Sequence, residues 1–296
     1  MAYPTDHIDI NRGTTGLTLT PEQSNEILAK AVEQSAVMRL AERVSLPGAG
    51  LSIPVITGEP VADFVAETAE KPVSNATFST KTMTPYKIAV IEMFSMEFRR
   101  DFRRLYDELV RRLPAALSTK FDATVFHGST PGTGFDVLTN ATAVDIATDP
   151  YAGLVEAYSD IATENYRPTG FALSPAAEVI LYGATDKEGR PLFLPSIADG
   201  SVGAILGAPV VKTSHVYKSG NPDVIGFVGD WSQAKYGIVD GINLAITDQA
   251  TINDGTNQIN LWQRNMFAVR AEFEVGFICA DTDAFVKLTN AAVASA

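Results

Sequence analysis

The chain has 296 residues, of which 46% are hydrophobic and 20% are charged, as in a folded protein with a sizeable core. Its formal net charge of −12 argues against a coat that binds nucleic acid through clustered lysines and arginines. The single cysteine, Cys279, excludes an intrachain disulfide and a cysteine-based zinc site. The polar start of the chain predicts no signal peptide, and no apolar run approaches the ~18 residues of a membrane span, so we expect synthesis in the cytosol.

The start of the chain predicts an arm followed by a helix. Residues 1–19 are polar and show no period, which is typical of an extended or flexible N-terminal arm. Thr20 followed by Pro21 predicts a helix start, because threonine caps helices and proline suits the first helical position. We expect this helix to run to about Val44, where Pro47 and two nearby glycines end it.

The next segment predicts a hairpin. From Ile53 to Phe94, prolines separate short runs of residues that favour β-strands. These runs are Ala62–Glu67, Thr77–Thr82 and Tyr86–Phe94. Between Thr68 and Thr77 the side chains are polar and small, so the tip of the hairpin has no core of its own. An isolated two-stranded hairpin is marginally stable in water, and we therefore interpret this one as an interaction element that needs a neighbour.

The segment Met93–Phe126 predicts a long helix, and we expect the rest of the chain to be organised around it. Apolar residues step by three or four along it and share one face: Phe94, Phe98, Phe102, Leu105, Leu109 and Leu113. The other face carries arginines interleaved with acids, which favours intrahelical or intersubunit ion pairs over contact with DNA. Pro114 predicts a bend, because proline lacks an amide donor and clashes with the preceding turn.

The glycine-rich stretch Gly128–Gly134 (GSTPGTG) superficially resembles a phosphate loop. The Lys-Ser/Thr pair that would follow in such a loop is missing, so we interpret the stretch as a linker at a domain boundary.

Beyond the linker the pattern is mixed α/β. Asp149-Pro150 and Ser174-Pro175 each predict a capped helix start; the first helix has Leu154, Tyr158 and Ile161 on one face, and the second runs to Tyr182. Asp186–Gly200 is predicted to be a loop, and Asp254-Gly255 a turn. The predicted strands are Phe171–Leu173, Pro209–Thr213, Val224–Val228, Tyr236–Ile246, Val269–Cys279 and Phe285–Leu288. In the strand that ends at Cys279, alternation turns four residues inward: Ala271, Phe273, Val275 and Phe277.

The sequence offers no candidate catalytic, cofactor-binding or metal residue, so we do not expect an enzyme. The three histidines, His7, His127 and His215, are not at metal-ligand spacing, and His127 suits a structural or capping role at a helix end. Asp281 and Asp283 are interpreted as a solvated turn rather than a cation site, and Cys279 as a buried thiol.

Four segments, in order along the chain, resemble the major capsid protein of tailed bacteriophages with the HK97-type fold. They are Asp186–Leu192 (DKEGRPL), Ile205–Thr213 (ILGAPVVKT), Gly229–Gly237 (GDWSQAKYG) and Arg270–Leu288 (RAEFEVGFICADTDAFVKL). They are similar, in turn, to the family's acidic-Gly-Arg-Pro loop, its Gly-x-Pro-Val-Val strand, its Gly-Asp-aromatic turn and its closing strand pair.

This resemblance implies an α+β, HK97-like capsid fold. Its parts would be an N-terminal arm (1–19), an N-terminal helix and lead-in (20–53), an extended β-hairpin E-loop (54–86), a peripheral P-domain with the long spine helix (87–134), a mixed α/β axial A-domain (135–256) and a return to the P-domain (257–296). The implied function is self-assembly, through pentamers and hexamers, into an icosahedral head shell. That shell would enclose phage double-stranded DNA without reading its sequence.

The implied partners are other copies of the chain, a separate scaffold protein (unless the sequence is already trimmed), a portal and a cement or decoration protein. No membrane and no cofactor are implied, and the implied location is the virion, after assembly in the cytoplasm of the bacterial host. Some relatives join subunits through a Lys–Asn isopeptide bond. Lys71 and Lys81 lie in the hairpin, but neither aligns with that lysine, so no cross-link is carried over.

Two other classes stay open at this point. An encapsulin-type nanocompartment would share the fold and enclose cargo enzymes instead of DNA. A hydrolase with a mixed α/β domain from Phe135 onward would be a discrete monomer or small oligomer with a polar pocket.

Overall fold

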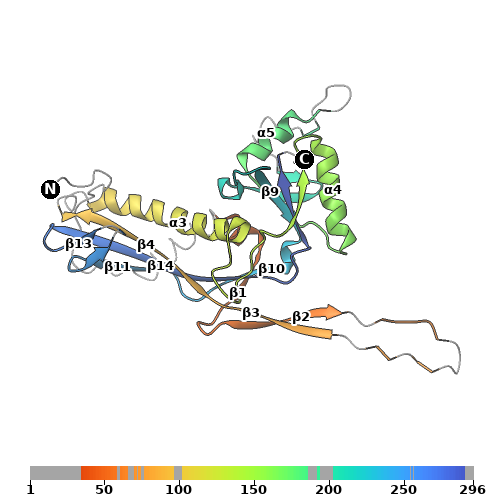
Figure 1. Ribbon diagram of the computed structural model, residues 1–296, viewed down its shortest axis with the longest axis horizontal. Coiled ribbons are helices and arrows are strands. Elements are labelled where there is room, and N and C mark those ends of the chain that lie inside the picture. The colour runs from red at the N-terminus through yellow and green to blue at the C-terminus, as the bar shows by residue number, and fades with distance from the viewer. Residues whose placement is uncertain are drawn as a thin grey trace.

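The molecule consists of an elongated sheet with a long helix along it, a second sheet flanked by helices, and a two-stranded arm that extends away from both (Figure 1). The computed structural model describes residues 35–58, 61–65, 70–71, 73–74, 77–96, 102–185, 192–193, 203–253, 255 and 257–290. The predicted N-terminal arm and the helix start at Thr20 lie outside these residues. So do most of the loop Asp186–Gly200 and the aspartate of the Asp254-Gly255 turn.

The elongated sheet is built around its longest strand, β14 (Met266–Cys279). On one edge β14 pairs antiparallel with β4 (Tyr86–Ser95), in a register that runs from Met266 opposite Ser95 to Val275 opposite Tyr86. Two further strands pair antiparallel with β14, namely β10 (Ala234–Ile238) and β11 (Asn243–Thr247). The predicted alternation is confirmed, because Ala271, Phe273, Val275 and Phe277 are all buried. The single predicted strand Tyr236–Ile246 is in fact two strands, β10 and β11.

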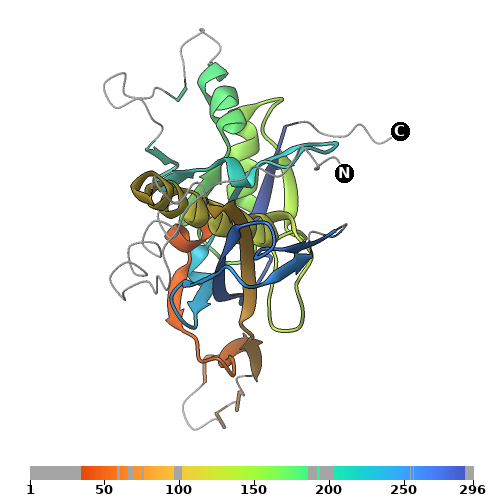
Figure 2. The ribbon, with the colours of Figure 1, turned by 90° about the vertical axis from the view of Figure 1, so that its left-hand side faces the viewer.

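The long helix, α3 (Phe102–His127), lies along one face of this sheet (Figures 1 and 2). The prediction that it begins at Met93 is wrong: residues up to Ser95 belong to β4, where the ladder with β14 satisfies their backbone groups and overrides helical spacing. The helix continues through Pro114. Its buried residues Leu117 and Phe121 face the sheet, and the Phe121 ring lies 6.4 Å from that of Phe277 in an edge-on contact.

The first described residues also differ from the predicted helix, which was expected to run to about Val44. Helix α2 is short (Ala36–Leu40), and β1 (Glu42–Ser45) occupies the stretch where the sequence predicted helix up to Val44. β1 lies parallel to β10 at the edge of the elongated sheet, from Glu42 opposite Lys235 onward. A tertiary pairing that local propensity does not reveal therefore decides this segment.

The arm is a hairpin of β2 (Leu51–Gly58) and β3 (Thr77–Met83), which pair antiparallel with each other and with no other described strand (Figure 1). The sequence predicted β3 but missed β2, whose apolar run Pro54 interrupts. Of the predicted strand Ala62–Glu67, the described residues 62–65 form no strand and pair with no described strand, and the last two residues lie outside the described part of the chain. The name hairpin arm is used below for residues 51–83.

The second sheet has six strands in the order β5–β15–β9–β6–β8–β7. Their bounds are Thr142–Asp145 (β5), Phe285–Thr289 (β15), Val224–Gly229 (β9), Gly170–Leu173 (β6), Ala208–Lys212 (β8) and Ala204–Ile205 (β7). Short 3-10 helices follow β8 (η2, Ser214–Val216) and β9 (η3, Trp231–Gln233). A small hairpin that the sequence did not predict, β12 (Thr251–Asn253) with β13 (Gln258–Asn260), precedes β14.

Helices α4 (Pro150–Thr163) and α5 (Pro175–Gly183) cover this second sheet and begin where the sequence predicted. The carboxylate of Asp149 accepts a hydrogen bond from the Ala152 amide, and the Ser174 hydroxyl accepts one from the Ala177 amide. Each cap is a local side-chain contact, which explains why a sequence motif was enough to find it.

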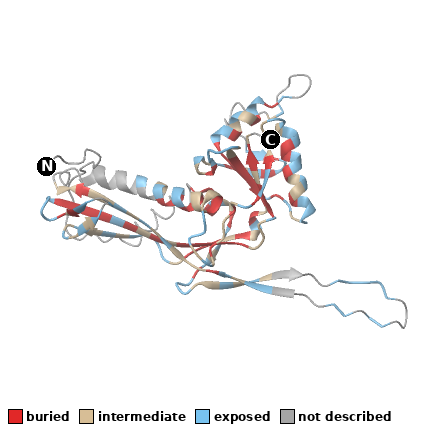
Figure 3. Cartoon of the chain, in the orientation of Figure 1, coloured by how far each residue is buried: buried red, intermediate tan, exposed pale blue. Residues whose placement is uncertain are grey.

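One of the four resembling segments, Gly229–Gly237, now has a structural meaning. In GDWSQAKYG, Asp230 caps η3 and places the buried indole of Trp231, whose Nε1 donates to the Gly170 carbonyl at 3.0 Å. The Trp231 ring meets Phe285 of β15 edge-on at 5.2 Å. This turn therefore joins the two sheets, and Figure 3 shows buried residues running from one sheet into the other.

Candidate assembly surfaces

The outer half of the hairpin arm exposes apolar side chains to solvent. Phe64 is fully exposed, Val73 is 91% exposed and Val61 is 75% exposed. The arm projects away from the rest of the molecule, and the described residues beyond the paired strands are exposed (Figure 3). A patch of this kind marks an interaction site, because burying a large apolar side chain is worth about 1.5–3 kcal/mol.

The base of the arm, by contrast, is fixed to the body. Met83 is fully buried against Leu46 and Ile278. The ammonium of Lys81 donates to the Cys279 carbonyl at 2.6 Å and lies 3.4 Å from the Asp136 carboxylate. Lys81 thus fastens the arm to β14, whereas Lys71 lies exposed farther out. The arm is held at one end and free at the other.

The predicted linker Gly128–Gly134 also contacts the strands at the arm's base. The Thr84 amide donates to the Gly134 carbonyl at 2.8 Å, and the Tyr86 hydroxyl donates to the Thr133 carbonyl at 2.9 Å. Gly134 has φ +81°, and a Cβ there would lie 2.6 Å from the Thr82 carbonyl oxygen, so only glycine fits. The loop is a structural clamp on the turn between β3 and β4.

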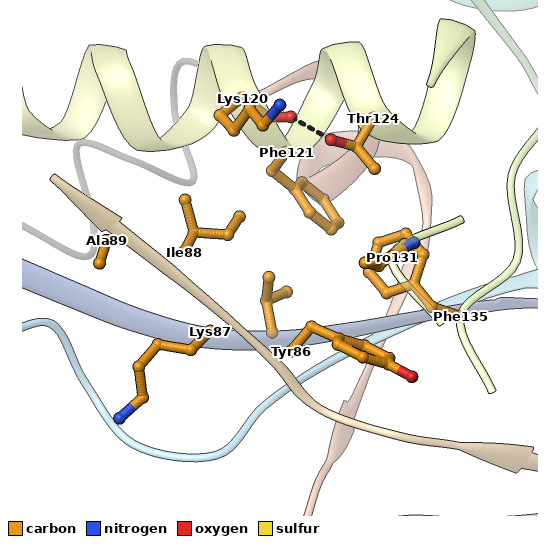
Figure 4. A pocket seen from close by; sticks show the side chains of 10 residues that line it. Tyr86, Lys87, Ile88, Ala89, Lys120, Phe121, Thr124, Pro131 and Phe135 are labelled. Carbon is orange, nitrogen blue, oxygen red and sulfur yellow. Dashed lines mark hydrogen bonds between the residues drawn. The ribbon is translucent and has the colours of Figure 1, made fainter. Parts of the chain in front are cut away.

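A cavity of about 370 Å³ lies between α3 and β4 (Figure 4). Its walls are mainly apolar and include Tyr86, Ile88, Phe121, Phe135 and Val275. The Thr124 hydroxyl on the helix side donates to the Lys120 carbonyl at 2.8 Å, drawn as a dashed line in Figure 4. Sequence reasoning did not find this cavity, because its walls come from three distant segments.

Two ion contacts bear on the predicted charged face of α3 and on the neighbouring strands. Burial raises the pKa of the Glu92 carboxyl on β4, and the positive charge of Arg112 on α3 opposes that rise. Lys87 lies 3.2 Å from Glu274 and 3.7 Å from Glu272 across the β4–β14 ladder, and these acids raise its pKa. Each of these contacts joins two different elements of one chain, so none of them is an intrahelical or intersubunit pair of the predicted kind. The other arginine side chains of the predicted face lie outside the described residues.

His127 has a structural role. Its Nε2 donates to the Val216 carbonyl at 2.6 Å, because a carbonyl oxygen can only accept. Its ring lies 5.7 Å from that of Phe227. Burial lowers the pKa of the imidazole, so the ring favours its neutral form in the folded protein.

We expect this histidine to make the subunit less stable in acid. Because its folded-state pKa lies below the usual 6.5, the unfolded chain binds the proton more readily. Its contribution to the free energy of unfolding is complete above about pH 6.5 and is lost as pH falls toward the lower folded-state pKa. Urea denaturation of wild type and His127→Gln between about pH 7.5 and 5.5 checks this, since glutamine donates the same bond without titrating. Equal pH slopes for the two proteins would contradict the prediction.

A buried carboxylate network joins α2, α3 and η2. Asp122, on α3, has no exposed surface; it accepts from the Ser35 hydroxyl at 2.5 Å and from the Ala36 amide at 2.9 Å. His215 places Nδ1 3.2 Å from the same carboxylate and Nε2 2.9 Å from the Thr119 hydroxyl. The side-chain contacts Thr119–His215–Asp122 have the order of a hydroxyl nucleophile, its base and the acid that orients the base. The Asp122 carboxylate, however, also binds the start of α2. We therefore interpret it as an anchor.

Asp281 and Cys279 make structural contacts. Asp281 accepts from the Asp283 amide at 3.0 Å and from the Tyr166 hydroxyl at 3.0 Å, which is a hydrogen-bonded turn. Cys279 is buried, as predicted, and burial raises the pKa of its thiol to about 12, so it stays protonated. Within the described residues no group of histidines, cysteines and acids is arranged to hold a metal ion, and no helix is long and apolar enough to cross a membrane. His7 lies outside these residues.

Comparison with known proteins gives matches over nearly the whole chain. The model of the phage capsid family matches residues 15–290. The probable major capsid protein gp17 of Mycobacterium phage D29 is 32% identical over 312 residues, covering 98% of this chain and 96% of that protein. The probable major capsid protein gp17 of Mycobacterium phage L5 is 34% identical over 295 residues, covering 92% and 89%.

Solved structures give the same result for the fold. A chain from Gordonia phage Cozz superposes with a TM-score of 0.72 at 23% identity, covering 98% of this chain and 92% of that one. A chain from Microbacterium phage Oxtober96 superposes with a TM-score of 0.73 at 19% identity, covering 98% of this chain and 96% of that one. A chain from the capsid of a native GTA particle superposes with a TM-score of 0.67 at 14% identity, covering 99% of this chain and 95% of that one.

Proposed function

Because the chain belongs to the phage capsid family, we propose that its copies assemble through pentamers and hexamers into an icosahedral head shell around phage double-stranded DNA. The protein is a major capsid protein with the HK97-like fold and is part of the virion; its role is structural and not enzymatic. The expected family, fold and role are thus confirmed, and a hydrolase is excluded. An encapsulin-type shell is not favoured, since the named relatives are phage capsid proteins.

One observation carries the assembly proposal. The hairpin arm is fastened at Met83 and Lys81, yet it exposes Phe64, Val61 and Val73 where its own chain does not cover them. In a shell, each arm lies across a neighbouring copy, which covers these side chains. Many moderate contacts of this type, repeated by symmetry, hold a closed particle together.

The division into domains is also a proposal. The elongated sheet with α3 supports a peripheral P-domain, the hairpin arm an E-loop, and the second sheet with α4 and α5 an axial A-domain. The predicted boundaries (1–19, 20–53, 54–86, 87–134, 135–256 and 257–296) stay a prediction. The chain crosses between the sheets more than once, because β10 and β11 lie in the elongated sheet and β15 lies in the second.

The partners beyond other copies of the chain follow from this role. We propose a scaffold protein, a portal and a cement or decoration protein, and assembly in the cytoplasm of the bacterial host. The net charge of −12 suits a wall that confines DNA and does not capture phosphates. No cross-link is proposed for Lys71, and Lys81 is already bound to the Cys279 carbonyl.

Electron microscopy of particles tests the function. We expect the chain, expressed alone or with its scaffold, to form closed shells in which fivefold and sixfold clusters are resolved. Particles isolated from a phage lysate are expected to protect double-stranded DNA from nuclease. Protein cargo in place of DNA would favour the nanocompartment, and a monomer at every concentration under both conditions would contradict assembly.

A further inference from the structure

We propose that the cavity between α3 and β4 receives the Phe64 side chain from the hairpin arm of a second copy of the chain. This docking rests on the proposed function, because it requires copies to be neighbours in a shell. It adds to that function a specific contact, with one anchor and one receptor.

The arm supplies the anchor. Phe64 is fully exposed and lies between two other exposed apolar residues, Val61 and Val65. The arm leaves the body at Met83 and extends away from the rest of the molecule (Figure 1), and none of residues 61–65 lines the cavity of their own chain. Aromatic side chains that fill a pocket are the residues that most often dominate an interface.

The cavity supplies the receptor. Its volume of about 370 Å³ lies in the range of pockets that hold a ligand group, and Figure 4 shows rings at its wall, Phe121, Phe135 and Tyr86. The two hydroxyl groups beside it are already bonded, since the Tyr86 hydroxyl donates to the Thr133 carbonyl and the Thr124 hydroxyl donates to the Lys120 carbonyl. An apolar ring therefore fits better than a polar group, and it gains edge-on contacts with the wall.

Charge complementarity favours the same pairing. Asp63 directly precedes Phe64 and is exposed. Lys120 is exposed at the cavity, and no ion-pair partner for its ammonium occurs among the residues with described side chains. When Phe64 enters the cavity, its acidic neighbour comes within reach of this lysine.

The arm and the cavity are different surfaces, and a contact between different surfaces closes into a ring when copies are related by rotation.

Cysteine cross-linking in assembled particles tests the docking. Cysteines at Ala62 and Ala89 keep Phe64 in place, and the native Cys279 is buried, so it does not interfere. After mild oxidation we expect a ladder of covalent multimers on a non-reducing gel, because a disulfide needs Cα atoms within about 7 Å. The pair Ala62→Cys with Thr124→Cys samples the opposite wall. The control pair Ala62→Cys with Val179→Cys, on the exposed face of α5, is expected to give none.

Each result has a meaning. A ladder from at least one cavity pair and none from the control supports the docking. Particles without a ladder from either cavity pair overturn it, as they would if the chain's own N-terminal residues filled the cavity. A cross-linked monomer also overturns it, because the arm would then fold back on its own chain. If the unaltered chain forms no particles at all, the proposed function fails as well.

Substitution of the anchor gives a second readout. Phe64→Ser is expected to weaken assembly by about 30-fold or more, which is the loss typical of truncating an aromatic residue at the centre of an interface. The free energy of unfolding of the unassembled subunit is expected to stay unchanged. Phe64→Leu keeps an apolar group and is expected to retain most assembly. Lys120→Glu should weaken assembly less, and adding Asp63→Lys should restore it. Equal assembly by Phe64→Ser and wild type would overturn the proposal.

Discussion

Asp122→Ala is expected to destabilise the subunit by about 3–5 kcal/mol, the largest effect of a single substitution that we predict. The carboxylate has no exposed surface, and its loss leaves the Ser35 hydroxyl and the Ala36 amide buried without an acceptor. It also removes the group that faces Nδ1 of His215. Urea denaturation of the unassembled subunit measures the change in the free energy of unfolding.

The matched control is another aspartate that caps a helix, Asp149. It accepts from the Ala152 amide at 3.1 Å at an exposed position, so Asp149→Ala is expected to cost about 1 kcal/mol. Asp122→Asn keeps the shape and part of the acceptor capacity and should lie between the two. If Asp122→Ala cost no more than Asp149→Ala, the network would not be the anchor described above.

Replacing residues 61–74 with a short Gly-Ser linker is expected to abolish assembly while leaving the subunit folded. Phe64, Val61 and Val73 are exposed in the single chain, so their removal should change the free energy of unfolding by no more than about 0.5 kcal/mol. Sedimentation velocity and negative-stain microscopy measure particle formation, and urea denaturation measures stability.

The base of the same arm should behave in the opposite way. Met83 is fully buried, and Met83→Ala is expected to cost about 2–5 kcal/mol even in the unassembled subunit. Should the linker variant unfold outright, the outer arm would belong to the core and the interpretation of the arm as an interaction element would be wrong.

The features that sequence reasoning predicted well are those with a local cause. The helix starts at Asp149 and Ser174 depend on side-chain oxygens that bind amides three residues later. The strand that ends at Cys279 was visible because its apolar residues alternate over a long stretch. The turn around Trp231 was visible through a resemblance, and its buried indole shows the physical reason for the motif.

The features that were missed depend on distant parts of the chain. Glu42–Ser45 forms a strand because β10 offers an edge almost 200 residues later, and helical spacing alone does not report that. The anchor at Asp122 joins residues separated by 87 and 93 positions. The cavity between α3 and β4 likewise has no sequence signature. Of the assembly surfaces, only the hairpin arm could be predicted, because the small polar residues between Thr68 and Thr77 indicated that its tip has no core of its own.

The long ladder between β4 and β14 has a mechanical consequence. Its antiparallel register holds from Met266 opposite Ser95 to Val275 opposite Tyr86. Ladder hydrogen bonds run perpendicular to the strands, so tension along the strand axis loads all of them at once and does not peel them one by one. A wall stretched from within by tightly packed contents therefore meets its stiffest resistance along this direction, and rupture is expected first at the contacts between copies.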